Sequence, residues 1–146
     1  MMKKVSPKQL SFKMVAIEMV ESILNQPHIQ ILEENIFQFD ISSEQRIHAA
    51  EGHIIVICTI TILNNIRDQQ LARIKSSCIF AVNDLVRYTD KKTDTINIPE
   101  DFRVNLNSIA ISTSRGILYS FLRGTYLHNA ILPIVNPSSF QLNKPE

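Results

Sequence analysis

The sequence predicts an α+β domain in which a four-stranded antiparallel sheet carries one long helix on one of its faces. Isoleucine, whose branched side chain favours strands, occurs 22 times in 146 residues. Three consecutive segments repeat apolar residues at every second position, and after Pro99 the repeat changes to that of a helix. A chain of this length corresponds to one hydrophobic core, so we expect residues 1–146 to fold as a single domain.

The three alternating segments predict three antiparallel strands in sequence. Residues 37–47 alternate apolar and polar side chains, which is typical of a strand with one face in water. Residues 54–63 are apolar on both faces and are expected in the middle of the sheet. Residues 72–82 alternate again and form the third strand. The turn between the first two strands is predicted at residues 49–53, which include a glycine.

The fourth strand is predicted at residues 12–24, where two periods overlap. One set of apolar residues recurs at every second position and another recurs at helical spacing, so both a strand and a helix are open, and we favour the strand. Pro27 ends this segment. Residues 25–35 then form a long crossing connection that carries Ile29 and Ile31.

The long helix is predicted from about Glu100 to Arg123, after a charged loop at residues 88–98 that is expected to be solvated. Proline and acidic residues at its start and Gly124 after its end are typical helix boundaries. At 100° per residue, its apolar side chains cover more than half of the circumference. A helix that lies on one sheet needs an apolar stripe of only about 100°, so this helix is expected to bury a second side in an oligomer interface.

Three small residues are predicted to belong to that interface. Ser112, Gly116 and Ser120 follow one another at four-residue spacing, at the edge of the apolar sector. Small side chains at this spacing let the backbone of a second subunit approach closely.

The C-terminal third of the chain also carries a set of short motifs in a specific order. They are Arg115 in the middle of the helix, the helix exit Arg123-Gly124-Thr125-Tyr126, the segment Leu132-Pro133-Ile134-Val135-Asn136, and Phe140, preceded by an Ile79-Phe80 pair at the end of the third strand. In these motifs the chain resembles the SecB family of protein-export chaperones, and the N-terminal half matches that family by its layout alone.

The resemblance implies a subunit of the predicted fold that assembles as a homotetramer, a dimer of dimers whose helices meet in the middle. It implies that unfolded or non-native polypeptides are held in apolar grooves, without ATP and without catalysis. The clients would belong to protein export or to one dedicated system, such as the antitoxin of a toxin–antitoxin pair. The alternative is a structural or interaction protein that uses the same fold without chaperone activity.

Three departures from the family pattern limit what is carried over. Only residues 136–146 remain for the second helix of the family, and two prolines interrupt them, so that helix is not expected. Ser77-Cys78 stands where the family has a glycine pair. With Leu71 on the family's sheet-surface leucine, Arg73 falls where the family has an acidic residue that docks the SecA motor. Arg73 and Lys75 share one face, which is expected to be basic and to disfavour SecA docking.

The candidate residues for a polypeptide groove are apolar side chains that this layout places outside the sheet core. Each of them is also open to the simpler interpretation that it covers the sheet as ordinary core. They are Ile29, Ile31, Tyr126, Leu127, Ile131, Leu132, Ile134 and Phe140.

Composition and motifs exclude other functions. The net charge of +1 does not favour nucleic acid, the N-terminus lacks the apolar stretch of a signal peptide, and no apolar run is long enough for a membrane span. Cys58 and Cys78 are expected to be reduced and buried in a cytoplasmic protein. His48 and His53 flank a turn without further ligands nearby, so no metal or other cofactor is predicted.

No catalytic motif is visible either, so we expect no enzyme, unless distant residues assemble a site. Arg115 and Arg123, about 80° apart on the helix, are open to anion binding, but pairing with an acidic neighbour is the favoured role.

Overall fold

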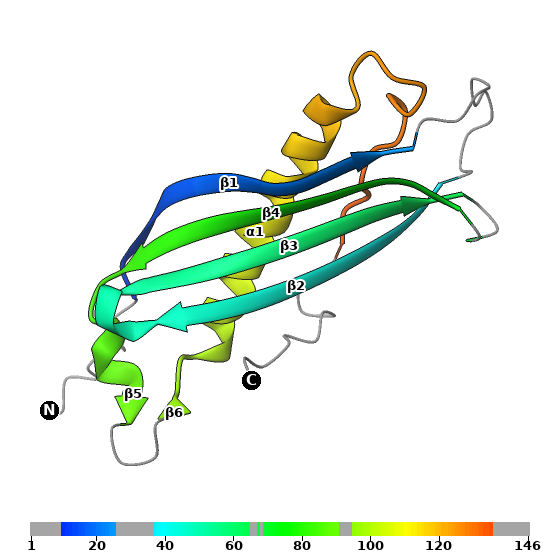
Figure 1. Ribbon diagram of the computed structural model, residues 1–146. Helices are drawn as coiled ribbons and strands as arrows, with labels where there is room; N and C mark the ends of the chain where they lie inside the picture. The colour runs from blue at the N-terminus through cyan, green and yellow to red at the C-terminus, as the bar shows by residue number, and fades with distance from the viewer. Residues whose placement is uncertain (1–9, 26–36, 65–66, 68, 91–94, 136–146) are drawn as a thin grey trace, which may run out of the picture.

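The four predicted strands form one antiparallel sheet. The structure, a computed structural model, describes residues 10–25, 37–64, 67, 69–90 and 95–135. The strands are β1 (Phe12–Leu24), β2 (Gln38–His48), β3 (His53–Leu63) and β4 (Gln70–Val82), and their order across the sheet is β1-β4-β3-β2 (Figure 1). The strand prediction for residues 12–24 is therefore confirmed, and the doubly apolar strand β3 lies inside the sheet. The predicted crossing connection after Asn25 lies outside the described residues.

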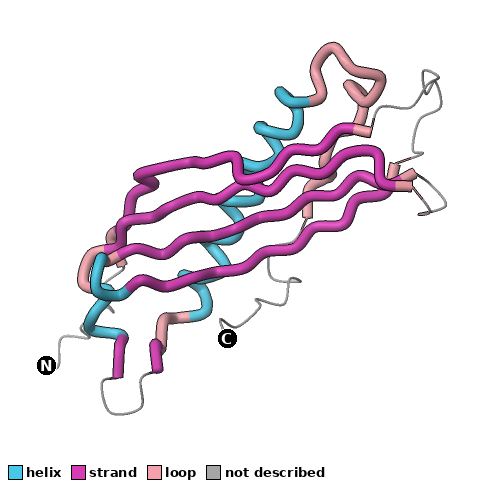
Figure 2. The backbone as a smooth tube through the Cα atoms, viewed as in Figure 1, coloured by secondary structure: helices cyan, strands magenta, loops and turns pink. Residues whose placement is uncertain are grey.

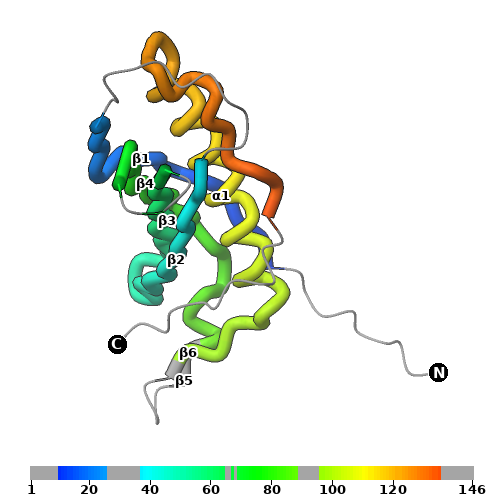
Figure 3. Tube along the Cα trace, turned by 90° about the vertical axis from the view of Figure 1, so that its right-hand side faces the viewer, coloured from blue at the N-terminus to red at the C-terminus, as the bar shows by residue number. Residues whose placement is uncertain are grey.

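The helix α1 (Glu100–Phe121) crosses one face of the sheet and leaves the other face open (Figure 1). It ends two residues before the predicted end at Arg123, because Leu122 already serves as its C-terminal cap. Gly124 has a φ of 79°, the left-handed conformation that was expected after the helix. Seen from the side, α1 and the segment that follows it make a second layer on the sheet (Figure 3).

Short elements fill the two predicted loops. The 3₁₀ turn η1 (Ala49–Glu51) and Gly52, with a φ of 69°, connect β2 to β3. The charged region at residues 88–98 was expected to be a solvated loop. Instead, η2 (Leu85–Tyr88) leads into a small ribbon of β5 (Thr89–Asp90) and β6 (Thr95–Ile96), and Ile98 behind it is buried (Figure 2).

The core between the sheet and α1 consists of two apolar clusters. One contains Ile60 and Ile62 of β3, and the other contains Phe80 of β4. Where the clusters meet, the buried hydroxyls of Ser76 and Ser114 lie 2.8 Å apart in a hydrogen bond that joins β4 to α1. The Ser114 hydroxyl also donates to the carbonyl oxygen of Ala110 at 2.7 Å, so a shift of the helix along the sheet would leave the buried Ser76 hydroxyl without this partner.

A second set of buried polar contacts joins β2 to the first half of α1. The hydroxyl of Ser43 donates to Oδ1 of Asn107, and Nε2 of Gln45 donates to the carbonyl oxygen of Arg103 at 2.9 Å. All three interacting side chains are buried. The helix is thus fixed on the sheet by polar contacts at two places as well as by apolar packing.

Both cysteines are free thiols in the core, as expected from the sequence. Burial raises the pKa of Cys58, while a hydrogen bond to Ser114 acts in the opposite direction. Burial also raises the pKa of Cys78, against a hydrogen bond to Thr113. The ordinary thiol pKa is 9.0, so both groups stay protonated at neutral pH and above.

We therefore predict that a thiol reagent labels native protein at pH 7.5 much more slowly than protein unfolded in guanidinium chloride. Only the thiolate reacts, and the native fold suppresses both its formation and access to it. The reaction is followed by absorbance with an aromatic disulfide reagent. Rapid labelling of one thiol in native protein would contradict the placement of that cysteine in a closed core.

Candidate interaction surfaces

The edge strand β1 exposes a row of apolar side chains. Its pairing with β4 is interrupted twice, between Met14 and Ala16 and between Met19 and Glu21, so Val15 and Val20 are extra residues at bulges. Each bulge changes which face of the sheet the following residues occupy. As a result, apolar residues are exposed on this edge at 37–56% of their surface: Val15, Ile17, Met19, Val20 and Ile23.

An open apolar groove lies between this edge and α1. Its volume is about 570 Å³, and it is lined by Met19 of β1 together with Thr113, Gly116, Ile117, Ser120 and Phe121 of α1. Two of the three predicted interface residues, Gly116 and Ser120, therefore lie in one groove, whereas Ser112 is exposed outside it. Sequence reasoning missed Met19, because its place in the groove depends on the bulges.

Nothing in the part of the chain that the structure describes requires glycine at position 116. A Cβ atom added there would meet no described atom within 4 Å beyond the neighbouring backbone of its own helix, and the backbone is helical. Glycine inside a helix is about 1 kcal/mol less favourable than alanine. Its presence is explained if a contact from outside the described subunit needs the space.

The apolar residues after α1 divide between the core and the surface. We call residues 126–135 the strap. Leu127 and Leu132, two of the predicted groove residues, are 0% and 2% exposed. In this conformation they cannot contact a polypeptide client. Tyr126, Ile131 and Ile134 are exposed. The other predicted groove residues, Ile29, Ile31 and Phe140, lie outside the described residues.

Arg115 contacts the backbone of the strap and not an acidic side chain. Its Nε donates to the carbonyl oxygen of Leu132 at 3.0 Å, and its Nη2 donates to that of Pro133 at 3.1 Å. Arg123 instead stacks on the ring of Tyr119, 4.9 Å from its centre, and donates to its hydroxyl. The favoured interpretation, pairing of both arginines with acidic neighbours, is thus wrong. Arg115 contacts backbone carbonyls of the strap, and Arg123 contacts an aromatic ring.

The open face of the sheet has mixed charge near Arg73. The bulges of β1 place Glu18 and Glu21 opposite Ser77 and Lys75 of β4, and Nε of Arg73 lies 3.6 Å from Oε1 of Glu21. The expectation of a basic face is therefore wrong. It considered β4 alone, and the neighbouring strand adds two carboxylates.

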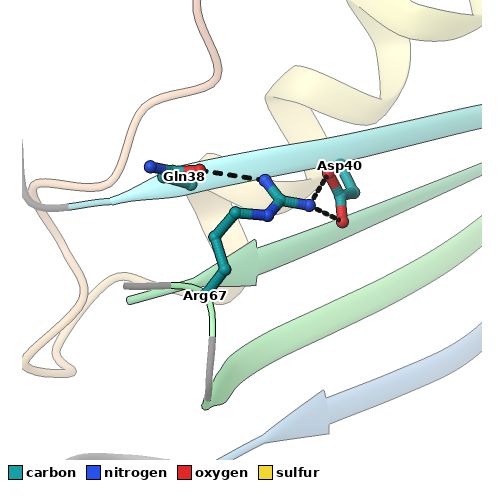
Figure 4. A network of polar contacts seen from close by, with 3 residues as sticks. All are labelled: Gln38, Asp40 and Arg67. Carbon is teal, nitrogen blue, oxygen red and sulfur yellow. Dashed lines mark hydrogen bonds and ion pairs between the residues drawn. The ribbon is translucent and has the colours of Figure 1, made fainter. Parts of the chain in front are cut away.

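A polar cluster at the other edge fixes the connection between β3 and β4. Arg67, with an unusual φ of 60°, donates to Oε1 of Gln38 at 3.0 Å and to both carboxylate oxygens of Asp40 at 2.6 Å (Figure 4). The Arg67 and Asp40 side chains are about half exposed, so this pair contributes at most about 1 kcal/mol to stability. Its effect is to hold Arg67 against the start of β2.

The described residues contain no group of three or more histidine, cysteine or acidic residues arranged to bind a metal. His48 and His53 face each other across the hairpin, and Nδ1 of His53 lies 3.8 Å from Oε2 of Glu51. Within the described part of the chain, no helix is both long and apolar enough to cross a membrane.

The fold is similar to that of Rv1957, a SecB-like chaperone of Mycobacterium tuberculosis, whose structure was solved in complex with a ChAD peptide from the Rv1956 HigA1 antitoxin. The TM-score is 0.55, the identity is 12%, and the match covers 85% of this chain and 89% of that chain. Sequence comparisons with family models and with characterised proteins find no match. The likeness is therefore one of fold, and it confirms the predicted fold class.

Proposed function

We propose that this chain is a SecB-like chaperone that holds unfolded or non-native polypeptides without ATP and without catalysis. The observation that carries the proposal is that a fold of this kind leaves apolar surface uncovered in two places, along β1 and on the outside of the strap. A chaperone of this type needs one such surface for assembly and one for its client. The fold likeness to a chaperone with a bound antitoxin peptide supports the same function.

The surface along β1 is assigned to assembly. A second copy that contacts the edge of β1 and inserts into the neighbouring groove would cover the exposed residues of β1 and use the space beside Gly116. Such a contact between identical surfaces has two-fold symmetry, which favours a dimer, and two dimers would make the homotetramer. In this proposal Gly116 and Ser120 lie in the contact through the groove, and Ser112 is exposed beside it on the same helix.

The strap side is assigned to the client. Tyr126, Ile131 and Ile134 offer apolar surface that lies outside the core. Clients would be recognised by apolar side chains in an extended chain, since the described residues of this region include no basic or acidic cluster. A dedicated client such as an antitoxin and a range of exported proteins both fit this chemistry, and cytoplasmic action fits both.

The decisive experiment measures the aggregation of a chemically unfolded test protein by light scattering. We expect suppression by this protein at fewer tetramers than test molecules, with no nucleotide added. The alternative, a structural or interaction protein, is favoured if the chain forms a stable assembly that leaves aggregation unchanged. That result would contradict the chaperone proposal.

Docking on the SecA motor is expected to be weak. The open face near Arg73 combines two basic side chains with Glu18 and Glu21, so it lacks a field of one sign. We predict that Arg73→Glu strengthens SecA binding without a change of oligomeric state, and that Lys13→Glu, a control on β1, has a smaller effect. Titration calorimetry measures both. Tight binding by the wild type would contradict this prediction.

A further inference from the structure

The strap is held in the core by side chains and by one arginine, and not by a backbone ladder. Within the described residues, the backbone hydrogen bonds of the strap connect it to itself or to Thr125, and none reaches a strand. Figure 3 shows it beside α1, on the same side of the sheet. The strap can therefore leave the sheet without breaking a ladder, and the cost of opening is set by the burial of its apolar side chains.

Residues 126–129 of the strap form hydrogen-bonded turns, and residues 130–135 follow without helix, strand or turn, as a bound peptide lies in an apolar site. Leu127, Ala130 and Leu132 are all buried, at 0–2% exposure, in the cluster that contains Ile60 and Ile62 of β3. Between them, Asn129 and Ile131 are exposed. The site thus accepts apolar side chains two or three residues apart from a chain without regular structure.

Arg115 completes this site through contacts that do not depend on sequence. Its two donors bind the carbonyl oxygens of Leu132 and Pro133. Every polypeptide has such carbonyl groups, so the same donors would serve another extended chain equally well.

We propose that the strap occupies the client site as an intramolecular stand-in, and that an extended apolar client segment displaces it and accepts the Arg115 hydrogen bonds through its own backbone. The inference rests on the proposed function and places the client in the site under the strap, so that the exposed side chains of Tyr126, Ile131 and Ile134 are not the final binding surface. It also reconciles the prediction of Leu127 and Leu132 as groove residues with their burial, because in the closed state they occupy the groove themselves. Only molecules with an open strap bind a client, so the apparent affinity is the intrinsic affinity multiplied by the fraction of molecules in which the strap is open.

The test uses the full chain and a fluorescent peptide of strap sequence, residues 126–135. Leu132→Ser weakens the strap in its site, so we expect this variant to bind the peptide about tenfold or more tightly than the wild type does. Asn129→Ser, at an exposed strap position, should bind as the wild type. Leu132→Ala is the milder variant if Leu132→Ser unfolds, as checked by amide exchange in β3. Equal peptide binding by wild type and by folded Leu132 variants would overturn the inference.

Amide exchange of the wild type with a reduced, carboxymethylated test protein gives a second measurement. Displacement predicts faster exchange in the strap when the test protein binds, and a client resting on a closed strap predicts unchanged or slower exchange. In that second case Ile131→Ser would weaken binding, and the inference would be wrong. If the strap peptide binds the Leu132 variants but no unfolded protein binds any form, the proposed function fails while the displaceable strap stands.

Discussion

Gly116→Leu is expected to break the assembly while leaving the subunit as stable as before or more stable. A Cβ added at Gly116 meets no side chain of the described residues within 4 Å, and the open groove beside it leaves room for the rest of the leucine. Leucine also favours the helix by up to about 1 kcal/mol relative to glycine. The same side chain would fill the groove beside Met19 that we assign to the second copy.

Light scattering at micromolar concentration measures the outcome. The wild type should be a tetramer, and Gly116→Leu should shift it to dimers or monomers of about 17 kDa, the mass of one chain being 16.7 kDa. Asn105→Leu is the matched control, because Asn105 is exposed on the same helix but does not line the groove. A monomeric wild type would contradict the proposed assembly. A Gly116→Leu variant that remains a tetramer would show that the subunit interface does not include the groove beside Gly116.

The elements of the fold were predictable because their periods are local properties. Strand β3 alternates without interruption from His53 to Leu63, and α1 starts at the predicted Glu100. The double period of residues 12–24 has a physical cause in the bulges at Val15 and Val20. Each bulge adds one residue and breaks the alternation, which in the sequence looks like a partial helical repeat.

The candidate site was less predictable, because burial after α1 depends on the tertiary fold. Leu127 and Ile131 are both aliphatic residues of an irregular segment, yet one is buried in the core and the other is exposed. No local pattern separates them. The partner of Arg115 is a pair of backbone carbonyls, which the sequence cannot distinguish from any others. The charge around Arg73 was mistaken for the same reason, since Glu21 reaches it from another strand.

The second large expected effect concerns the stability of the subunit and compares two neighbouring residues of β4, Phe80 and Ile79, whose side chains lie on opposite faces of the sheet. Phe80 is fully buried in the cluster that joins β4 to α1, and its ring lies edge-on to that of Phe12 of β1, with 6.0 Å between the ring centres. Phe12 in turn contacts Phe102 of α1 at 5.3 Å. Phe80 therefore holds together the sheet, the edge strand and the start of the helix.

Phe80→Ala is expected to lower the free energy of unfolding by about 3–5 kcal/mol, because it removes a buried ring and leaves a cavity in a closed core. Ile79→Ala is the control, since Ile79 is only partly buried and lies on the open face; its cost should stay below about 1.5 kcal/mol. Urea unfolding followed by circular dichroism compares the two. Assembly stabilises the subunits by mass action, so both variants are measured at one protein concentration. Similar losses for Phe80→Ala and Ile79→Ala would contradict a core confined to the helix side of the sheet, and with it the placement of α1, the strap and the groove on that side.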